Sequence, residues 1–197
     1  MGFSDIMVGM NKELKSKMLP LVLAVVVIVL DQITKALICH FIPINTFGTQ
    51  VLGDFIQIIH VRNNGVAFSF GATWPDVLRR LAFSIIPIIV LGIVIRIYFK
   101  NNDFTQVQRW GICGVVGGGF GNIIDRVFRP AGVVDFIDVK WFGIESSPLK
   151  LFQMERWPTF NVADSAVVVC GIMLVISFLV QIIRESKNKS EDSVEEK

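Results

Sequence analysis

Residues 19–42 read LPLVLAVVVIVLDQITKALICHFI, and this stretch decides the fold class. A helix of roughly 20 apolar residues crosses the hydrocarbon core of a bilayer, and this run is long enough. Asp31 and Lys35 are its only Asp, Glu, Lys or Arg residues. Such charges are costly inside a membrane, and their spacing of four residues places them on one helix face, where they can pair. The stretch therefore predicts a membrane-spanning helix with an internal ion pair.

Three further apolar stretches have the length of a membrane span, at residues 81–99, 107–124 and 165–183. The stretch 107–124 is the least apolar, because it carries six glycines. The 197 residues are 52% hydrophobic and 18% charged, a balance unlike that of a soluble domain. We therefore expect a polytopic α-helical membrane protein with four transmembrane helices.

The distribution of basic residues predicts the orientation. With four spans, both termini share one side of the membrane, and that side holds ten Lys and Arg residues against eight in the opposite loops. The excess predicts cytoplasmic termini, so that loops 43–80 and 125–164 face outward. Partial alternation in residues 51–71, with a turn signal at Asn63-Asn64-Gly65, and in residues 132–143 predicts short strands. We expect a small extracytoplasmic β-sheet built from both loops.

The ends of the chain are polar. Residues 1–18 form a basic stretch with no small-residue cleavage site after the apolar run, so we expect a cytoplasmic leader and an uncleaved first helix. Residues 184–197 have the composition of a disordered cytoplasmic tail, which leaves 19–183 as one membrane domain. The net charge of +2 favours no nucleic-acid partner. Cys39, Cys113 and Cys170 are interpreted as buried packing residues, and we expect no metal or other cofactor.

Polar residues gather where the predicted helices and strands reach the outward side. Each has a structural interpretation: an ion-pair clip, a solvated loop, or a helix cap such as Asn161 with Asp164 three residues later. The functional interpretation is that they converge at one level to form an active site. The residues alone leave both open. Glycines spaced by four, at 114 and 118 and at 117 and 121, favour close helix contact, which would bring Asn122 and Asp125 against a neighbouring helix.

Five blocks in order resemble the lipoprotein signal peptidases, the bacterial family called signal peptidase II: DQITK, VRNNGVAFSF, GGGFGNIIDR, VVDFID and FNVADSA, within residues 18–183. The resemblance implies an aspartyl endopeptidase of the inner membrane that acts at its outer face. Its substrate would be a diacylglyceryl-modified prolipoprotein, cut before the lipidated cysteine. The implied catalytic pair is Asp135 and Asp164. The implied supporting or substrate-binding residues are Asp31, Lys35, Asn63, Gly65, Asn122, Asp125, Arg126 and Asn161.

Paired carboxylates suit this chemistry, because two that lie close together share one proton and can act as acid and base on water. We expect Asp164, at a helix start, to hold the negative charge, and Asp31 and Lys35 to support the site without taking part in the reaction. The long segment 139–159 either covers the site or lies on lipid headgroups. The expected partners are the prolipoprotein and membrane lipids, and the expected state is a monomer. The alternatives are a small transporter or ion-translocating subunit and a non-catalytic scaffold.

Overall fold

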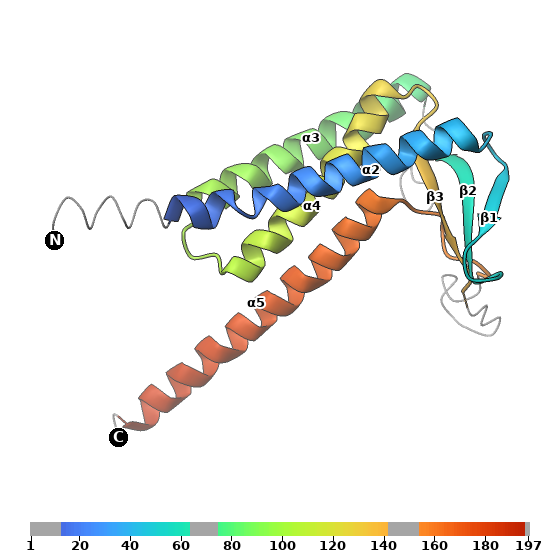
Figure 1. Ribbon diagram of the computed structural model, residues 1–197. Helices are drawn as coiled ribbons and strands as arrows, with labels where there is room; N and C mark the ends of the chain where they lie inside the picture. The colour runs from blue at the N-terminus through green and yellow to red at the C-terminus, as the bar shows by residue number, and fades with distance from the viewer. Residues whose placement is uncertain (1–12, 64–74, 142–153, 196–197) are drawn as a thin grey trace.

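The computed structural model describes residues 13–63, 75–141 and 154–195 (Figure 1). The elements in chain order are α2 (Leu21–Phe41), β1 (Phe47–Gln50), β2 (Ile56–Asn63), α3 (Asp76–Lys100), α4 (Gln106–Phe128), β3 (Val133–Val139) and α5 (Val162–Glu195). Figure 1 shows the small sheet at one end of the helices and the C-terminal part of α5 extending away from the others.

Each of the four predicted apolar stretches forms a helix. Within the described residues, three helices are long and apolar enough to cross a membrane: Glu13–Phe41, Leu81–Lys100 and Val162–Asn188. Helix α4 is not among them, because its glycines and polar residues lower its hydropathy. It lies in the middle of the bundle and contacts α2, α3 and α5, so much of its surface meets protein. The structure thus shows three strongly apolar helices around a fourth.

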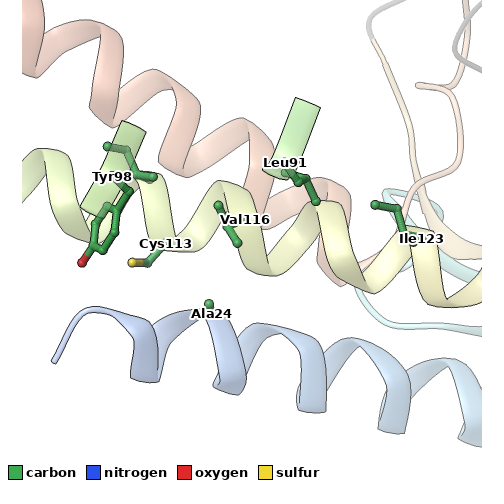
Figure 2. Close-up of a cluster of buried hydrophobic side chains, with 7 residues drawn as sticks. Ala24, Leu91, Tyr98, Cys113, Val116 and Ile123 are labelled. Carbon is green, nitrogen blue, oxygen red and sulfur yellow. The ribbon is translucent and has the colours of Figure 1, made fainter. Parts of the chain in front are cut away.

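The hydrophobic core surrounds α4. Figure 2 shows Ala24 of α2 and Leu91 and Tyr98 of α3 directed toward Cys113 and Val116 of α4. These side chains are all less than a tenth exposed. Since the rest of α2, α3 and α5 presents many exposed Val, Leu and Ile residues, the apolar surface of the molecule is mostly on its outside, as in a protein solvated by lipid.

The glycines of α4 allow its neighbours to approach at backbone distance. A Cβ atom at Gly117 would lie 2.8 Å from the Cα of Ala24, and one at Gly118 would collide with the carbonyl oxygen of Ala163. The first contact is with α2 and the second with α5. This confirms the close approach that the glycine spacing predicts, and it brings the end of α4 against both helices that carry predicted site residues.

The sheet is antiparallel, with strand order β1-β2-β3. Since β3 comes from the second loop and pairs with β2 from the first, both loops build one sheet, as predicted. The predicted turn at Asn63-Asn64-Gly65 begins at the last residue of β2, and its other two residues lie outside the described part of the chain. The structure adds a hairpin that was not predicted: β1 and β2 are joined by a turn over residues 51–55, where Gly53 has a φ of 54°. Glycine takes this left-handed conformation without strain.

Helix α5 continues to Glu195, past residue 183 where the sequence predicts the last span to end and a disordered tail to begin. The segment 184–195 contains neither proline nor glycine and includes several glutamates and lysines. A helix already formed in the preceding span is extended at one hydrogen bond per residue, so nothing in this segment stops it.

Candidate active site

Lys35 is at the centre of a buried charge network at the sheet end of the helices. Its Nζ atom lies 2.9 Å from Oδ2 of Asp31 and 3.1 Å from Oδ2 of Asp125, and it donates to Oδ1 of Asn122 at 2.9 Å. Each of the three ammonium protons therefore has an acceptor. The side chains of Lys35, Asp31 and Asp125 are fully buried. An unpaired ion at such a place costs several kcal/mol, so these partners explain how the bundle holds the charges.

The two carboxylates of this network also fix backbone segments. Oδ1 of Asp31 accepts the N–H of Ala163 at 3.0 Å, and Oδ2 of Asp125 accepts the N–H of Val134 at 3.0 Å. Asp31 thus holds the first turn of α5, and Asp125 holds strand β3. Arg129 pairs with Oδ1 of Asp125 at 3.0 Å, so the group contains two carboxylates and two cations.

A second group of side chains surrounds two further carboxylates. Asp135 on β3 accepts a hydrogen bond from Nδ2 of Asn63 at 2.9 Å and one from Nδ2 of Asn161 at 2.7 Å. Asp164, in the first turn of α5, accepts a hydrogen bond from Nδ2 of Asn122 at 2.7 Å and one from the backbone N–H of Asn161 at 3.1 Å. Three asparagines from three parts of the chain therefore hold both carboxylates. We call this group the asparagine cradle.

Asn161 caps helix α5 and also donates a hydrogen bond to Asp135. Its Oδ1 accepts the N–H of Asp164 at 2.9 Å, while Oδ2 of Asp164 accepts the N–H of Asn161, which is a reciprocal cap at the start of α5. The same side chain donates through Nδ2 to Asp135 and, at 3.1 Å, to Oδ1 of Asn122. That Oδ1 also accepts from Lys35, so the charge network and the asparagine cradle are continuous.

The protonation of Asp135 departs from that of a solvated carboxyl. Burial raises the pKa of Asp135 to about 6, and the negative charge of Asp164 acts in the same direction. The hydrogen bonds from Asn63 and Asn161 and the charge of Lys35 oppose this rise. Asp135 is only 3% exposed. It can therefore carry a proton at a pH where a solvated carboxyl has lost its own.

A cavity of about 350 Å³ opens beside Asp164. Its other lining residues are Trp157, Phe160, Ser165, Val168 and Val169. The wall is almost entirely apolar, and Asp164 and Ser165 are its polar residues. An apolar cavity with a few polar groups is the usual form of a small-molecule or peptide pocket.

The structure brings together most of the side chains that the sequence predicts for the site. Arg126 is the exception, because its guanidinium carbon lies 5.7 Å from the ring centroid of Phe83 on α3, although its charge still acts on Asp164 and Asp135. Gly65 lies outside the described residues. Those that the charge network and the asparagine cradle bring together are Asp31, Lys35, Asn63, Asn122, Asp125, Asp135, Asn161 and Asp164.

Two residues of the charge network were not predicted. Gln32 donates through Nε2 to Oδ2 of Asp31 at 3.1 Å and to Oδ1 of Asp125 at 3.2 Å, so it bridges α2 and α4. Arg129 follows Asp125 by four residues, which is the spacing of a helical ion pair and a signal that the sequence does carry. Gln32 has no such signal, because a neighbour of Asp31 along a helix ordinarily faces another direction.

Two carboxylates held in one polar cradle, at the end of strongly apolar helices, suit acid–base chemistry at a membrane. The comparisons with known proteins identify the family. Residues 23–180 match the family described as "Signal peptidase (SPase) II", and the chain belongs to this signal peptidase II family, as the resemblance predicts.

The relatives of this chain cover most of its length. It is 49% identical over 167 residues to the lipoprotein signal peptidase of Treponema pallidum (strain Nichols), covering 85% of this chain and 86% of that protein. It is 45% identical over 180 residues to that of Treponema denticola, covering 91% of this chain and 99% of the relative. A solved structure described as "Bacterial membrane enzyme structure by the in meso method at 2.3 A resolution" matches with a TM-score of 0.67 and 31% identity, covering 83% of this chain and 88% of that one.

Proposed function

We propose that Asp135 and Asp164 are the catalytic pair of an intramembrane aspartyl endopeptidase. It removes the signal peptide from diacylglyceryl-modified prolipoproteins by cutting before the lipidated cysteine. One observation carries the assignment: Asn161 donates to Asp135 and caps the helix turn that contains Asp164. Carboxylates from separate elements are thereby joined through a single side chain. Family membership supports the reaction, and the asparagine cradle supports the choice of residues.

The two carboxylates take different roles. Burial and a pKa of about 6 favour the proton on Asp135, while the first turn of a helix favours an anion at Asp164. Ionised Asp164 takes a proton from water as the oxygen attacks the scissile carbonyl. Protonated Asp135 donates a hydrogen bond to the carbonyl oxygen as charge develops there, and a proton then passes to the departing amine.

The cavity beside Asp164 supports an apolar substrate. Trp157, Phe160 and Val168 line the cavity with apolar surface, which can bind the hydrocarbon part of a substrate. The scissile bond would then lie beside the carboxylate of Asp164. Prolipoprotein segments next to the cut, with the acyl chains of the modified cysteine nearby, have the required chemistry.

Four membrane-spanning helices are part of this proposal. The 23 residues of α4 give a length of about 35 Å at 1.5 Å per residue, enough for a core about 30 Å thick. A central helix needs less hydropathy than its neighbours, because it faces mainly protein. Hydrogen bonds from Tyr98 to the carbonyl of Lys17 and from Arg109 to the carbonyl of Asn101 join the far ends of α2, α3 and α4. This basic end supports cytoplasmic termini and an outward-facing sheet. The proposal also includes a single peptidase domain over 19–183 and a monomeric state.

A transporter or ion-translocating subunit is not favoured. Proton or ion pathways need polar groups spread through the membrane. Among the described residues, the buried carboxylates are Asp31, Asp125, Asp135 and Asp138. Asp31 and Asp125 accept backbone N–H groups of α5 and β3, and the other two lie on β3, so all four belong to the sheet end of the molecule.

Cleavage of a lipid-modified prolipoprotein tests the catalytic pair. Asp135→Asn and Asp164→Asn should each lower the cleavage rate by about 10³-fold or more. Asp138→Asn is the matched control, since Asp138 lies on the same strand, is also buried, and pairs with Nε of Arg156 at 2.6 Å away from the asparagine cradle. Normal cleavage by either catalytic variant, or equal loss in a folded Asp138→Asn protein, would reject the assignment.

A further inference from the structure

The thiol of Cys39 is surrounded by basic side chains. Its Sγ atom accepts hydrogen bonds from Nη2 of Arg62 at 3.2 Å and from Nη1 of Arg129 at 3.2 Å, and Nε2 of His60 lies 4.0 Å away. These residues come from α2, β2 and the end of α4. Packing was predicted for all three cysteines. It is confirmed for the other two, which are buried, and is wrong for Cys39, which is half-buried in a polar cluster.

His60 is oriented to act as a base toward Cys39. The ring is 1% exposed, and Nδ1 lies 2.7 Å from the carbonyl oxygen of Ile42. A carbonyl oxygen can only accept, so Nδ1 carries a hydrogen, and in the neutral form of the ring the lone pair is on Nε2. That lone pair is the one nearest to Sγ. A thiol next to a base oriented by a third group is the arrangement that makes a sulfur nucleophilic.

The two guanidinium groups favour negative charge at this place. Arg62 donates to the sulfur and, at 3.4 Å, to the carbonyl of Gly132, but its Nε atom is buried with no hydrogen-bond partner among the described residues. A buried donor left unsatisfied costs about 1–3 kcal/mol. An anionic group attached to Cys39 would provide the missing acceptor. The sulfur atom and its surroundings therefore point to an anionic reagent.

The cluster is joined to the charge network through one residue. Arg129 contacts the sulfur through Nη1 and Oδ1 of Asp125 through Nε, at 3.0 Å. Asp125 in turn accepts the N–H of Val134, the residue before Asp135. A group added to Cys39 competes for the guanidinium of Arg129 and so changes the support of Asp125.

We propose that Cys39 is a modification site, where small disulfides and thiosulfonates that carry a negative charge form a mixed disulfide and thereby lower peptidase activity. In this step Nε2 of His60 takes the thiol proton and Sγ attacks the sulfur of the reagent. A new S–S bond forms, and the leaving thiolate or sulfinate departs with the electron pair of the broken bond. The anionic part of the adduct then binds Arg62 and Arg129. Only the activity readout rests on the proposed function; the labelling does not.

Two methanethiosulfonate reagents test the site on the full chain in detergent, one with a sulfonate group and one with a trimethylammonium group. Labelling of each cysteine is followed by mass spectrometry, and each rate is divided by the rate with free cysteine. At Cys39 the normalised rate should be about tenfold or more higher for the anionic reagent. Arg62→Gln should lower this ratio severalfold, while Arg129 maintains part of the preference. Cys39→Ala, which keeps Cys113 and Cys170, is the control for labelling elsewhere.

The same samples report on activity. The sulfonate adduct should lower prolipoprotein cleavage severalfold, dithiothreitol should restore it, and the reagent should leave Cys39→Ala unaffected. Equal normalised rates for the two reagents, or faster labelling of Cys113 or Cys170, would overturn the site. Unchanged cleavage after full modification would overturn the link through Arg129. If Arg62→Gln yields no folded protein, the ratio of the two reagents on the unaltered chain decides.

Discussion

Lys35→Met removes the ammonium group from the buried charge network and keeps the size of the side chain. In the native protein this group contacts Asp31, Asp125 and Asn122 at 2.9 to 3.1 Å. After the change, Arg129 still pairs with Asp125, whereas Asp31 has no other ion pair among the described residues. Asp31 keeps the N–H of Ala163 and Asp125 keeps the N–H of Val134, so neither loses every partner.

The expected loss follows from these contacts. Breaking a buried ion pair by removing one partner costs about 3–5 kcal/mol. For a chain of 197 residues, each kcal/mol corresponds to roughly 2–4 °C in the unfolding midpoint, so the variant should unfold about 6 to 20 °C below the native protein. Cleavage should fall with stability, because Asn122 also loses the donor that orients its amide toward Asp164.

Thermal unfolding in detergent, followed by tryptophan fluorescence, measures this loss. The double variant Asp31→Asn/Lys35→Met should recover at least about 1 kcal/mol relative to Lys35→Met alone, because it removes an uncompensated charge. Lys140→Met, which breaks an exposed pair with Asp54, is the control and should leave the midpoint unchanged. The reasoning fails if Lys35→Met unfolds at the native temperature yet has lost cleavage, since Lys35 would then act on the reaction directly.

Three other predictions concern the helix contacts and the asparagine cradle. Gly118→Ala should lower the free energy of unfolding by about 1–3 kcal/mol, because the added Cβ collides with the carbonyl of Ala163, whereas Gly92→Ala, with nothing within 4 Å, should not; chemical or thermal unfolding compares the two. The kcat/KM for cleavage should decline as the pH rises through about 6, where Asp135 loses its proton, and a flat profile from pH 5 to 8 would contradict this. Asn63→Ala removes a hydrogen bond that lowers the pKa of Asp135, so the declining limb should move to higher pH, and a shift to lower pH would be the wrong sign.

The helices could be predicted because their signal is local. Long apolar runs specify α2, α3 and α5 wherever they occur, and the glycine spacing of α4 specifies close neighbours. A hydropathy pattern does not predict that α4 lies in the middle of the bundle, because that position depends on contacts with α2, α3 and α5. The turn over residues 51–55 was also missed, because Asn63-Asn64-Gly65 is the stronger turn signal in sequence.

The site was partly predictable for the same reason. Asp31 with Lys35 and Asn161 with Asp164 are pairs at helical spacing, so their partners are fixed by local geometry. The cluster around Cys39 joins residues up to 90 positions apart, and no local pattern relates them. Long-range hydrogen bonds of this kind become visible only once the helices and the sheet are assembled.

Asn161 both caps α5 and donates a hydrogen bond to Asp135, and this limits which residues can replace it. At an ordinary helix start, Ser, Thr, Asp and Asn are nearly interchangeable, and an engineer seeking a more thermostable variant would exchange them freely. Here the cap must accept the N–H of Asp164 and also donate to Asp135. A carboxylate in its place would face Asp135 without a proton to donate, and a hydroxyl is too short to span both contacts. Libraries built to stabilise this chain should therefore hold position 161 constant and seek their gains elsewhere, for example on the lipid-facing side of α3.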